Sequence, residues 1–405
     1  MQSFSRKINQ QFGIIKFCSF FENLFQNFQH HDLITILATE LRAKPKSTDP
    51  LKFGHHYTDH MFEVNWQSGK GWDAPTISPL HNLSLHPGSK VFHYAIELFE
   101  GLKAYKGIDG KIRLFRPDMN MQRMRRTAER ASLPDFSGDE LLKIINDLVQ
   151  IEREWIPNSP MTSLYIRPAF IGTDPTLGVG KSSSAKLFVL TSPIGQYWDE
   201  SVEGEKAVSL LADPAYVRSF YGGVGAYKMG CNYAPTIFVA QIAHQKQCQQ
   251  VLWLHGPNEN IAEVGTMNIF VFWKNEQGEE ELITPTLSGE IILPGITRDS
   301  IITLTREWNE FKVIERNISM AEIRKATKEK RILQIFGSGT ACVVTPVGRI
   351  LYKNNSTDTY EELLIPTLQC KANVMQRCRD AISDIQVSKF LVFNSFLIYC
   401  LGFSY

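Results

Sequence analysis

The sequence predicts an α/β (α+β) protein of two domains, and three observations support this fold class. A chain of 405 residues is longer than one hydrophobic core usually organises. Apolar residues make up 43% of it and charged residues 21%, the balance of a soluble globular protein. Segments of helical periodicity alternate with segments of strand character, without a repeat period. We expect the domains to join near 197–207, where Asp, Glu, Gly and Ser accumulate.

Capping and spacing define the elements of the first half. Ser137 and Glu140 form a capping box before apolar residues that recur on one helical face. Pro134 separates this helix from an earlier one. That earlier helix and two strands are predicted at 120–131, 164–166 and 187–191.

The second half shows a hairpin and several helices. Two strand patterns, 268–273 and 281–284, flank a polar turn that ends in Gly278. Pro294-Gly295 precedes one predicted helix, and Ser319 with Glu322 caps another. A strand and a last amphipathic helix are predicted at 251–254 and 367–385.

The two ends of the chain differ from its middle. Before Glu22 the chain is basic and free of acidic residues, which is typical of a mitochondrial presequence, although a plain disordered arm has the same composition. We therefore expect the mitochondrial matrix or the cytoplasm, and favour the matrix. The run from Phe390 to Phe403 is apolar but shorter than the ~20 residues of a membrane span. It indicates a packed tail or an irregular end to the reading frame.

Charge and cysteine content exclude several classes of function. The formal net charge is +1, so no overall field favours a nucleic acid or an acidic membrane. Seven cysteines without a C-x-x-C pair form neither a disulfide framework nor a usual structural zinc site. We therefore expect no nucleic acid, membrane or metal partner.

A lysine surrounded by glycines is the first candidate for chemistry. Lys228 lies in the segment GGVGAYKMG (222–230), and glycine allows a backbone to approach a ligand closely. Burial would lower the pKa of the lysine and keep its amine neutral, able to form an imine with a carbonyl carbon. The alternative is a flexible loop with a surface lysine.

Three further segments offer contacts for a ligand. Glu263 precedes a strand, where a carboxylate could hold the protonated ring nitrogen of a pyridine cofactor or simply be solvated. The turn LPGITR (293–298) opens a helix, whose free N–H groups suit a phosphate, although an ordinary helix cap looks the same. The glycine-rich loop FGSGTA (336–341) could bind a carboxylate.

Taken together, these segments carry a family resemblance. From about Asp32 to Gln386 the chain resembles the eukaryotic branched-chain amino-acid aminotransferases, which are class IV, fold-type IV pyridoxal-phosphate enzymes. The segments that match are HYAIELFEGLKAY (93–105), KIRLFRPDMNMQRM (111–124), SLYIRPAFIG (163–172), LADPAYVR (211–218), YKMGCNY (227–233), QQVLWLHGP (249–257), EVGTMNIFVFW (263–273), LPGITR (293–298) and FGSGTACVV (336–344).

The resemblance implies a two-domain fold similar to that of D-amino-acid aminotransferase. A smaller N-terminal α/β domain would precede a larger pseudo-barrel domain that binds pyridoxal 5′-phosphate. The expected order is an N-terminal extension, the small domain, a linker, the cofactor domain and an apolar tail, at 1–30, 31–197, 198–212, 213–388 and 389–405.

The resemblance also assigns the cofactor contacts. Lys228 corresponds to the lysine that forms the Schiff base with pyridoxal phosphate and then moves the proton. Tyr233 corresponds to the partner of the phenolic oxygen of the cofactor, and Glu263 to the partner of the pyridine nitrogen. The expected phosphate contacts are Arg123, Ile296, Thr297 and Thr340.

The substrate side is assigned in the same way. The wall around the aliphatic side chain corresponds to Phe53, Tyr94, Phe99, Tyr165, Tyr197 and Thr266. Thr340 and Ala341 correspond to the donors for the substrate carboxylate, with the Tyr94 hydroxyl beside them. Arg167 corresponds to an arginine near the side-chain pocket, suited to the second carboxylate of glutamate. Core packing alone is the alternative for Phe53 and Phe99.

The implied activity is a ping-pong amino transfer between leucine, isoleucine or valine and 2-oxoglutarate, carried out by a homodimer. Two alternatives remain open. A class IV relative acting on D-amino acids or aminodeoxychorismate would share most of these residues. A catalytically dead homologue kept as an interaction protein would usually lose the lysine, the acid or the phosphate arginine, and this chain keeps all three.

Overall fold

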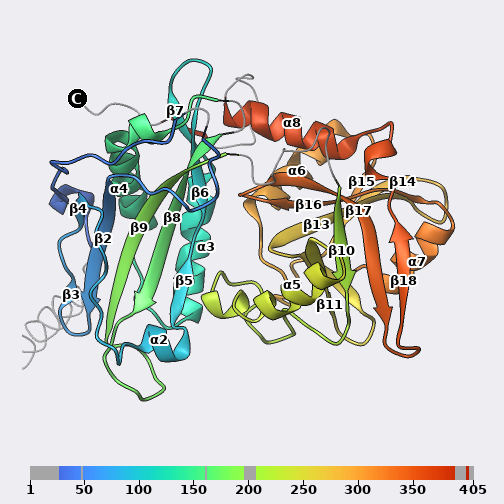
Figure 1. Ribbon diagram of the computed structural model, residues 1–405, viewed down its shortest axis with the longest axis horizontal. Coiled ribbons are helices and arrows are strands. Elements are labelled where there is room, and N and C mark those ends of the chain that lie inside the picture. Colours follow the sequence, from blue (N-terminus) through green and yellow to red (C-terminus); the bar gives the residue numbers. More distant parts are fainter. Residues whose placement is uncertain (1–26, 47–48, 160–161, 196–206, 388–397, 401–405) are drawn as a thin grey trace, which may run out of the picture.

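The computed structural model describes residues 27–46, 49–159, 162–195, 207–387 and 398–400. The chain forms two halves that lie side by side, each built on one large sheet (Figure 1). Apart from one strand near the C-terminus, the first sheet uses residues up to 194, and the second begins at 208. Most of the predicted join at 197–207 lies outside the described residues.

The first sheet has ten strands within the described part of the chain, in the order β1-β4-β2-β9-β8-β6-β7-β19, with β3 beside β2 and β5 beside β8. Neighbouring strands are antiparallel except β1 and β4. Their bounds are β1 (Ile34–Thr35), β2 (His60–Gln67), β3 (Gly71–Trp72), β4 (Thr76–Pro79), β5 (Glu97–Phe99), β6 (Leu102–Lys106), β7 (Ile112–Phe115), β8 (Ser163–Gly172), β9 (Ser184–Ile194) and β19 (Ile398–Cys400).

Helices α3 (Pro117–Arg130) and α4 (Gly138–Ile151) share one core with this sheet. The predicted apolar face of α4 is buried and packs in a cluster with Phe62, Phe136 and Phe170. Each such side chain contributes roughly 1.5–3 kcal/mol when fully buried. The short helices of this half are α2 (Lys90–Tyr94), η2 (His30–Asp32) and η3 (Arg153–Trp155).

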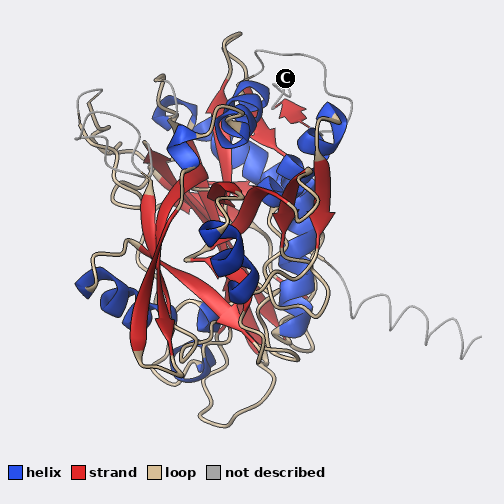
Figure 2. Cartoon of the chain, turned by 90° about the vertical axis from the view of Figure 1, so that its right-hand side faces the viewer, coloured by secondary structure: helices blue, strands red, loops and turns tan. Residues whose placement is uncertain are grey.

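The second sheet closes on itself. Strands β12-β11-β10-β17-β16-β13 follow one another, and an additional pairing of β12 with β13 completes the ring. β14, β15 and β18 extend it. Figure 2 views the molecule from the side of this half and shows strands that cross at different angles. Their bounds are β10 (Val208–Ala212), β11 (Gln250–His255), β12 (Asn260–Val264), β13 (Met267–Lys274), β14 (Glu280–Thr284), β15 (Lys312–Glu315), β16 (Ile332–Gly339), β17 (Val343–Asn354) and β18 (Thr359–Leu364).

Four α-helices of the described chain cover this sheet. α5 shares an apolar cluster with β11, and α6 and α8 share another with β13 and β16. Their bounds, with that of α7 and two 3-10 helices, are α5 (Thr236–Gln245), α6 (Ile296–Trp308), α7 (Met320–Lys328), α8 (Val374–Gln386), η4 (Gly230–Asn232) and η5 (Thr367–Gln369). No described helix has the length and apolar character needed to span a membrane.

Most predicted elements are present, with shifted ends. The hairpin of β13 and β14 and the capping box of α7 are confirmed. At α4 the Ser137 side chain accepts from Glu140 N, but the Glu140 carboxylate accepts from His30 N instead of closing the box. The predicted helix 367–385 is wrong in its first part, because Asn373 has a left-handed backbone (φ 44°) and α8 begins after it.

The described structure also bears on the segment boundaries. Phe28, within the expected extension 1–30, is buried in the core of the first sheet. β10 occupies the last part of the expected linker 198–212 and pairs with β11 and β17. From the apolar tail, β19 pairs antiparallel with β7. The chain end thus returns to the N-terminal half.

Candidate active site

Lys228 lies where the two halves meet, just before η4. Its backbone N–H donates to Thr127 Oγ1 of α3 at 3.3 Å, and its carbonyl accepts from Phe99 N of β5 at 3.1 Å. Its Nζ lies 3.3 Å from the Tyr233 hydroxyl and 4.7 Å from the centre of the Phe99 ring. The structure therefore brings Lys228, Tyr233 and Phe99 together, as predicted.

The glycines around Lys228 permit close packing. A Cβ at Gly225 would lie 2.2 Å from the Ile291 carbonyl oxygen, and one at Gly230 would lie 1.7 Å from Glu97 Oε1. Only Gly222 of this segment has a left-handed backbone, with φ +79°. The loop is therefore packed against its surroundings, and the alternative of a free surface loop is not what the structure contains.

Glu263 is a buried carboxylate on β12 with incomplete hydrogen bonding. Its Oε1 accepts from Leu293 N at 3.1 Å and from Asn268 Nδ2 at 3.3 Å. Its Oε2 forms an ion pair with Arg218 Nη1 at 2.7 Å, but no contact of Oε2 meets the angles of a hydrogen bond. Burial raises the pKa of Glu263, and the charge of Arg218 opposes this only in part.

The LPG turn before α6 depends on a glycine. Asn268 Nδ2 also donates to the Leu293 carbonyl at 2.9 Å, which ties β13 to this turn. A Cβ at Gly295 would lie 2.0 Å from Asn268 Oδ1. Any larger residue would displace the side chain that supports Glu263, so the glycine fixes the distance between β13 and the start of α6.

Arg123 is held by a second buried carboxylate. Its Nε and Nη2 donate to Glu100 at 2.7 and 2.9 Å, and its Nη1 donates to the Pro294 carbonyl at 3.0 Å. These contacts use three of the five N–H bonds of a guanidinium. Asn120 Nδ2 and Gly101 N also donate to Glu100, at 2.8 and 3.0 Å. The Arg123 pair lowers the pKa of Glu100 despite its burial.

Three of the four predicted phosphate contacts line one small cavity. Ile296, Thr297 and Thr340 line a cavity of about 20 Å³ together with Gly101 and Asn120. The first N–H groups of a helix have no partner within it, so the start of α6 presents donors here. Arg123 reaches the same place through its contact with Pro294, next to the helix start.

Lys103 supports the loop after β16. Its Nζ donates to the Ala341 carbonyl at 2.9 Å, and burial lowers the pKa of Lys103 to about 8. Thr340 and Ala341 are half-buried in this loop. A cation therefore lies beside the backbone that was predicted to bind a carboxylate.

The predicted substrate wall is assembled in part. The Phe53 and Tyr165 rings are 4.8 Å apart, and Arg167 Nη2 donates to the Tyr165 hydroxyl at 3.0 Å. The Arg167 guanidinium lies 4.6 Å from the centre of the Phe99 ring, which in turn packs against Tyr233 at 4.9 Å. One continuous set of side chains thus runs from Phe53 to Lys228.

Three predicted wall residues are not joined to this set. The Tyr94 hydroxyl donates to the Leu177 carbonyl, and its side chain is 36% exposed. Thr266 is exposed in the turn between β12 and β13. Tyr197 lies outside the described residues. Their roles stay predictions.

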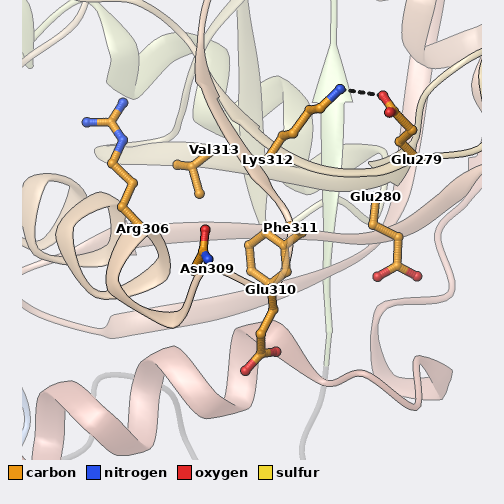
Figure 3. A pocket seen from close by; sticks show the side chains of 8 residues that line it. All are labelled: Glu279, Glu280, Arg306, Asn309, Glu310, Phe311, Lys312 and Val313. Atoms are coloured by element: carbon orange, nitrogen blue, oxygen red, sulfur yellow. Dashed lines mark hydrogen bonds and ion pairs between the residues drawn. The ribbon is translucent and has the colours of Figure 1, made fainter.

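A separate groove of about 510 Å³ lies at the end of α6 and the start of β15 (Figure 3). Its charged side chains include Lys312, which pairs with Glu279, and Glu310, which pairs with Arg377. None of the residues that line it is a predicted site residue. No described group of His, Cys, Asp and Glu side chains could hold a metal ion.

Comparison with known proteins identifies the family. A model described as Amino-transferase class IV matches residues 97–350. The cytosolic branched-chain-amino-acid aminotransferase of Caenorhabditis elegans is 57% identical over 368 residues, 90% of this chain and 88% of that protein. The mitochondrial enzyme of Rattus norvegicus is 48% identical over 360 residues, 89% of each. The chain belongs to the class IV aminotransferases, within the branched-chain-amino-acid aminotransferase family.

Solved structures confirm the fold class. A branched-chain aminotransferase from Thermoproteus uzoniensis, solved with norvaline, has a TM-score of 0.65 at 20% identity and covers 84% of this chain and 99% of its own. The enzyme from Thermobaculum terrenum in its PLP form has a TM-score of 0.64 at 19% identity, with 85% and 99% covered. At these identities the likeness concerns the fold alone, which is the predicted two-domain fold-type IV architecture with a closed sheet in its second half.

Sequence reasoning missed four residues of the site. Glu100, Lys103 and Arg218 lie within matching segments, and Asn268 follows the predicted acid, yet none received a role. A buried charge requires a partner of opposite charge or several hydrogen bonds. The cofactor contacts predicted for Arg123 and Glu263 imply an enclosed site, so their need for partners was the signal that could have indicated these four residues.

Proposed function

We propose that this protein is a branched-chain-amino-acid transaminase that interconverts leucine, isoleucine or valine and 2-oxoglutarate with the branched-chain 2-oxo acid and glutamate. The observation that carries the proposal is the meeting of a lysine amine, an incompletely bonded buried carboxylate and an anion-binding helix start at one junction. The family and its curated relatives support the same activity.

The residues present fit pyridoxal 5′-phosphate. Glu263 Oε2 accepts no hydrogen bond from the described residues, although it is buried, and a protonated pyridine nitrogen would supply the missing donor. Tyr233 has its hydroxyl beside Lys228 Nζ, where it can donate to the phenolic oxygen. Ile296, Thr297, Thr340 and the remaining N–H bonds of Arg123 suit the phosphate.

The cofactor, when bound, supplies the electron sink that stabilises charge at the amino acid Cα after its proton leaves. Lys228 would hold the cofactor between turnovers, and its amine would carry the proton from the substrate Cα to C4′ of the cofactor in one half-reaction and in the opposite direction in the other. Glu263 keeps the ring nitrogen protonated. The two half-reactions use the same residues, which gives ping-pong kinetics.

The substrate contacts divide by chemistry. The backbone N–H groups of Thr340 and Ala341 bind the carboxylate, while Phe53, Phe99 and Tyr165 surround the aliphatic side chain. The Arg167 Nε is buried and has no hydrogen-bond partner in the described chain, so it suits the second carboxylate of glutamate. Tyr94, Tyr197 and Thr266 complete the wall in this proposal, on the family resemblance alone.

Substitution of Lys228 tests the mechanism. Lys228→Ala is expected to lower turnover by about 10⁴-fold and to abolish the cofactor absorbance typical of a lysine adduct. Lys106→Ala, an exposed lysine, is the matched control and should retain both. Normal turnover in Lys228→Ala would refute the assignment.

Substrate profiling separates the two rival functions. A half-reaction spectrum with each candidate amino acid distinguishes the branched-chain substrates from D-amino acids and aminodeoxychorismate. Purified protein that stays colourless and unresponsive to added pyridoxal phosphate would instead support an interaction protein without catalysis.

A homodimer is the proposed assembly. Phe92, Leu177 and Val179 are 60%, 67% and 85% exposed, and the Tyr94–Leu177 hydrogen bond joins the two segments that carry them. A second copy of the chain would cover these apolar side chains. Sedimentation analysis tests this, and Leu177→Asp with Val179→Asp should shift the protein toward the monomer.

The cellular compartment is the mitochondrion or the cytoplasm, because curated relatives occur in both. Between the two we infer the mitochondrial matrix, on the basic and acid-poor segment before Glu22. A fluorescent fusion of residues 1–30 tests this. Diffuse cytoplasmic fluorescence would contradict it.

A further inference from the structure

We propose that Arg126 and Thr127 of α3 are positioning residues for Lys228, so that the N-terminal half sets the reach of the lysine amine. This inference rests on the proposed function and extends it to residues that contact neither cofactor nor substrate. It concerns how the protein holds the lysine backbone in position, and not the chemical role of the lysine.

Both backbone polar groups of Lys228 bond to the N-terminal half, although the lysine belongs to the second. Its N–H donates to Thr127 Oγ1 at 3.3 Å, and its carbonyl accepts from Phe99 N at 3.1 Å. The next residue, Met229, forms an isolated β-bridge with Leu98. Thr127 is fully buried, and its own hydroxyl donates to the Arg123 carbonyl at 2.8 Å. The Thr127 hydroxyl therefore donates its proton to the Arg123 carbonyl, and its oxygen accepts from the Lys228 N–H.

The residues before Lys228 are held by the same helix. Arg126 Nη2 donates to the Ala226 carbonyl at 2.6 Å, and its guanidinium lies 5.0 Å from the centre of the Tyr227 ring. The Arg130 guanidinium lies 5.8 Å from that ring, and the Tyr227 hydroxyl donates to Glu290 Oε1 at 3.0 Å. The side chain before the lysine is therefore fixed on its faces by cations and at its end by a carboxylate.

These contacts come from one face of α3. Positions 123, 126, 127 and 130 recur at helical spacing, so their side chains share a side of the helix. The first of them is Arg123, the proposed phosphate contact. One rigid element therefore holds the anchor for the phosphate and the backbone of the lysine at a fixed separation.

The separation matters because proton transfer requires close geometry. An amine must come within about 3 Å of the atom whose proton it moves, and a misplacement of about 1 Å can lower the rate roughly a hundredfold. Loss of the Arg126 bond to Ala226 would free the segment before the lysine without removing any group that touches the cofactor. The effect should then fall on kcat and on the reactivity of the Lys228 amine, with little change in KM.

The experiment compares two pairs of variants. Arg126→Met removes the bond to Ala226. Arg125→Met is its control, because Arg125 lies on the exposed side of the same helix and pairs there with Asp135. Thr127→Val removes the acceptor of Lys228 N–H, and Thr127→Ser keeps the hydroxyl as the conservative rescue. For each variant kcat and KM are measured in the holoenzyme. In cofactor-free protein, mass spectrometry follows the acetylation rate of Lys228 against pH, with the other lysines as internal references.

Arg126→Met and Thr127→Val are expected to lower kcat about tenfold with KM changed less than about threefold. Both should also change the acetylation rate of Lys228 relative to the reference lysines, while Arg125→Met and Thr127→Ser match the wild type. Unchanged kcat and acetylation in both variants would overturn the proposal. So would a lower melting temperature with an unchanged acetylation profile, since that pattern describes a brace between domains. If Arg126→Met fails to fold, the Thr127 pair decides.

Proposal and function can fail separately. The wild-type protein could lack transaminase activity while its Lys228 acetylation still depends on Arg126 and Thr127. That result would refute the proposed function but would support the positioning role of Arg126 and Thr127. An active enzyme in which both variants behave as wild type would do the reverse.

Discussion

Two buried carboxylates at the domain junction, Glu100 and Glu263, share a type of partner and differ in how completely they are bonded. Each is paired with an arginine of comparable burial, Arg123 for Glu100 and Arg218 for Glu263. Glu100 accepts four hydrogen bonds, spread over both of its oxygens. Glu263 accepts two, both on Oε1.

The pKa of each group follows this difference. Hydrogen bonds and an ion pair favour the charged form of Glu100 enough to lower its pKa despite burial, while burial prevails at Glu263 and raises its pKa. A fully bonded pair serves to hold Arg123 in place. Glu263 Oε2 has an ion pair but accepts no hydrogen bond within the described chain, so it can still accept one from a ligand that brings its own proton donor.

The largest expected effect is on folding stability at Glu100. Glu100→Gln leaves Arg123 as a buried cation without a counter-charge, which should lower the free energy of unfolding of the cofactor-free protein by about 3–5 kcal/mol. Glu263→Gln also removes the partner of a buried arginine, Arg218, but should cost less, because burial raises the pKa of Glu263 and disfavours its charged form. Chemical denaturation at neutral pH measures both free energies of unfolding. Equal losses in the two variants would contradict the proposed difference between Glu100 and Glu263.

The pH dependence of that difference has a fixed sign. The pKa of Glu100 is lowered from the ordinary value of 4.5, so its ionisation adds stability above pH 4.5 that is lost as the pH falls through its value in the folded protein. The stability gap between wild type and Glu100→Gln should therefore shrink in acid. The shift at Glu263 has the opposite direction, so its contribution falls as the pH rises above 4.5.

The next effect is on catalysis and concerns Glu263. Glu263→Gln cannot keep the cofactor ring nitrogen protonated, so kcat should fall about 10²- to 10³-fold while folding is retained. Stopped-flow measurement of the leucine half-reaction checks this. A Glu263→Gln enzyme whose kcat lies within a few-fold of the wild-type value would show that Glu263 Oε2 has no role in the chemistry.

The smallest expected effect concerns Lys103, a buried charge that bonds to the Ala341 carbonyl and pairs with no carboxylate of the described chain. Because its pKa is about 8, its charge beside Ala341 should disappear above that pH, and KM for a 2-oxo acid should rise about fivefold. A 2-oxo acid is used because it has no amine of its own to titrate. Lys103→Met should show the high KM at every pH, and a parallel rise in both proteins would contradict the assignment.

The stability arising from Lys103 should change in the same range. Between pH 8 and its ordinary value of 10.5 the folded protein binds fewer protons than the unfolded chain, so this group adds stability as the pH rises. The difference in unfolding free energy between wild type and Lys103→Met isolates that contribution from other lysines and tyrosines.

The sequence predicted elements correctly where neighbouring residues alone determine the geometry. The capping box at Ser319 and the polar turn of the 268–284 hairpin define their own geometry and are confirmed. The helix predicted over 367–385 begins only after Asn373, whose backbone is left-handed. The amphipathic spacing of apolar residues gives no sign of such an interruption.

The site was predicted as a set of residues and not as a geometry. Lys228 and Glu263 came from motif order and resemblance, whereas Arg218 and Glu100 act through contacts made only when distant segments meet. Closure of the second sheet likewise depends on the pairings of β10 with β17 and of β13 with β16, which join segments far apart in the chain. Spacing along the chain cannot reveal such contacts.

The contacts that hold the Lys228 backbone have a consequence for the order in which the chain is translated. Chains emerge from the ribosome N-terminus first, so Phe99 and Thr127, which hold the lysine backbone, are made before the lysine itself. The proposed partners of the cofactor ring and phosphate, Glu263, Thr297 and Thr340, follow later. A nascent chain thus has the groups that hold its lysine backbone early, but the proposed cofactor site is complete only after β16 and Thr340 have been made.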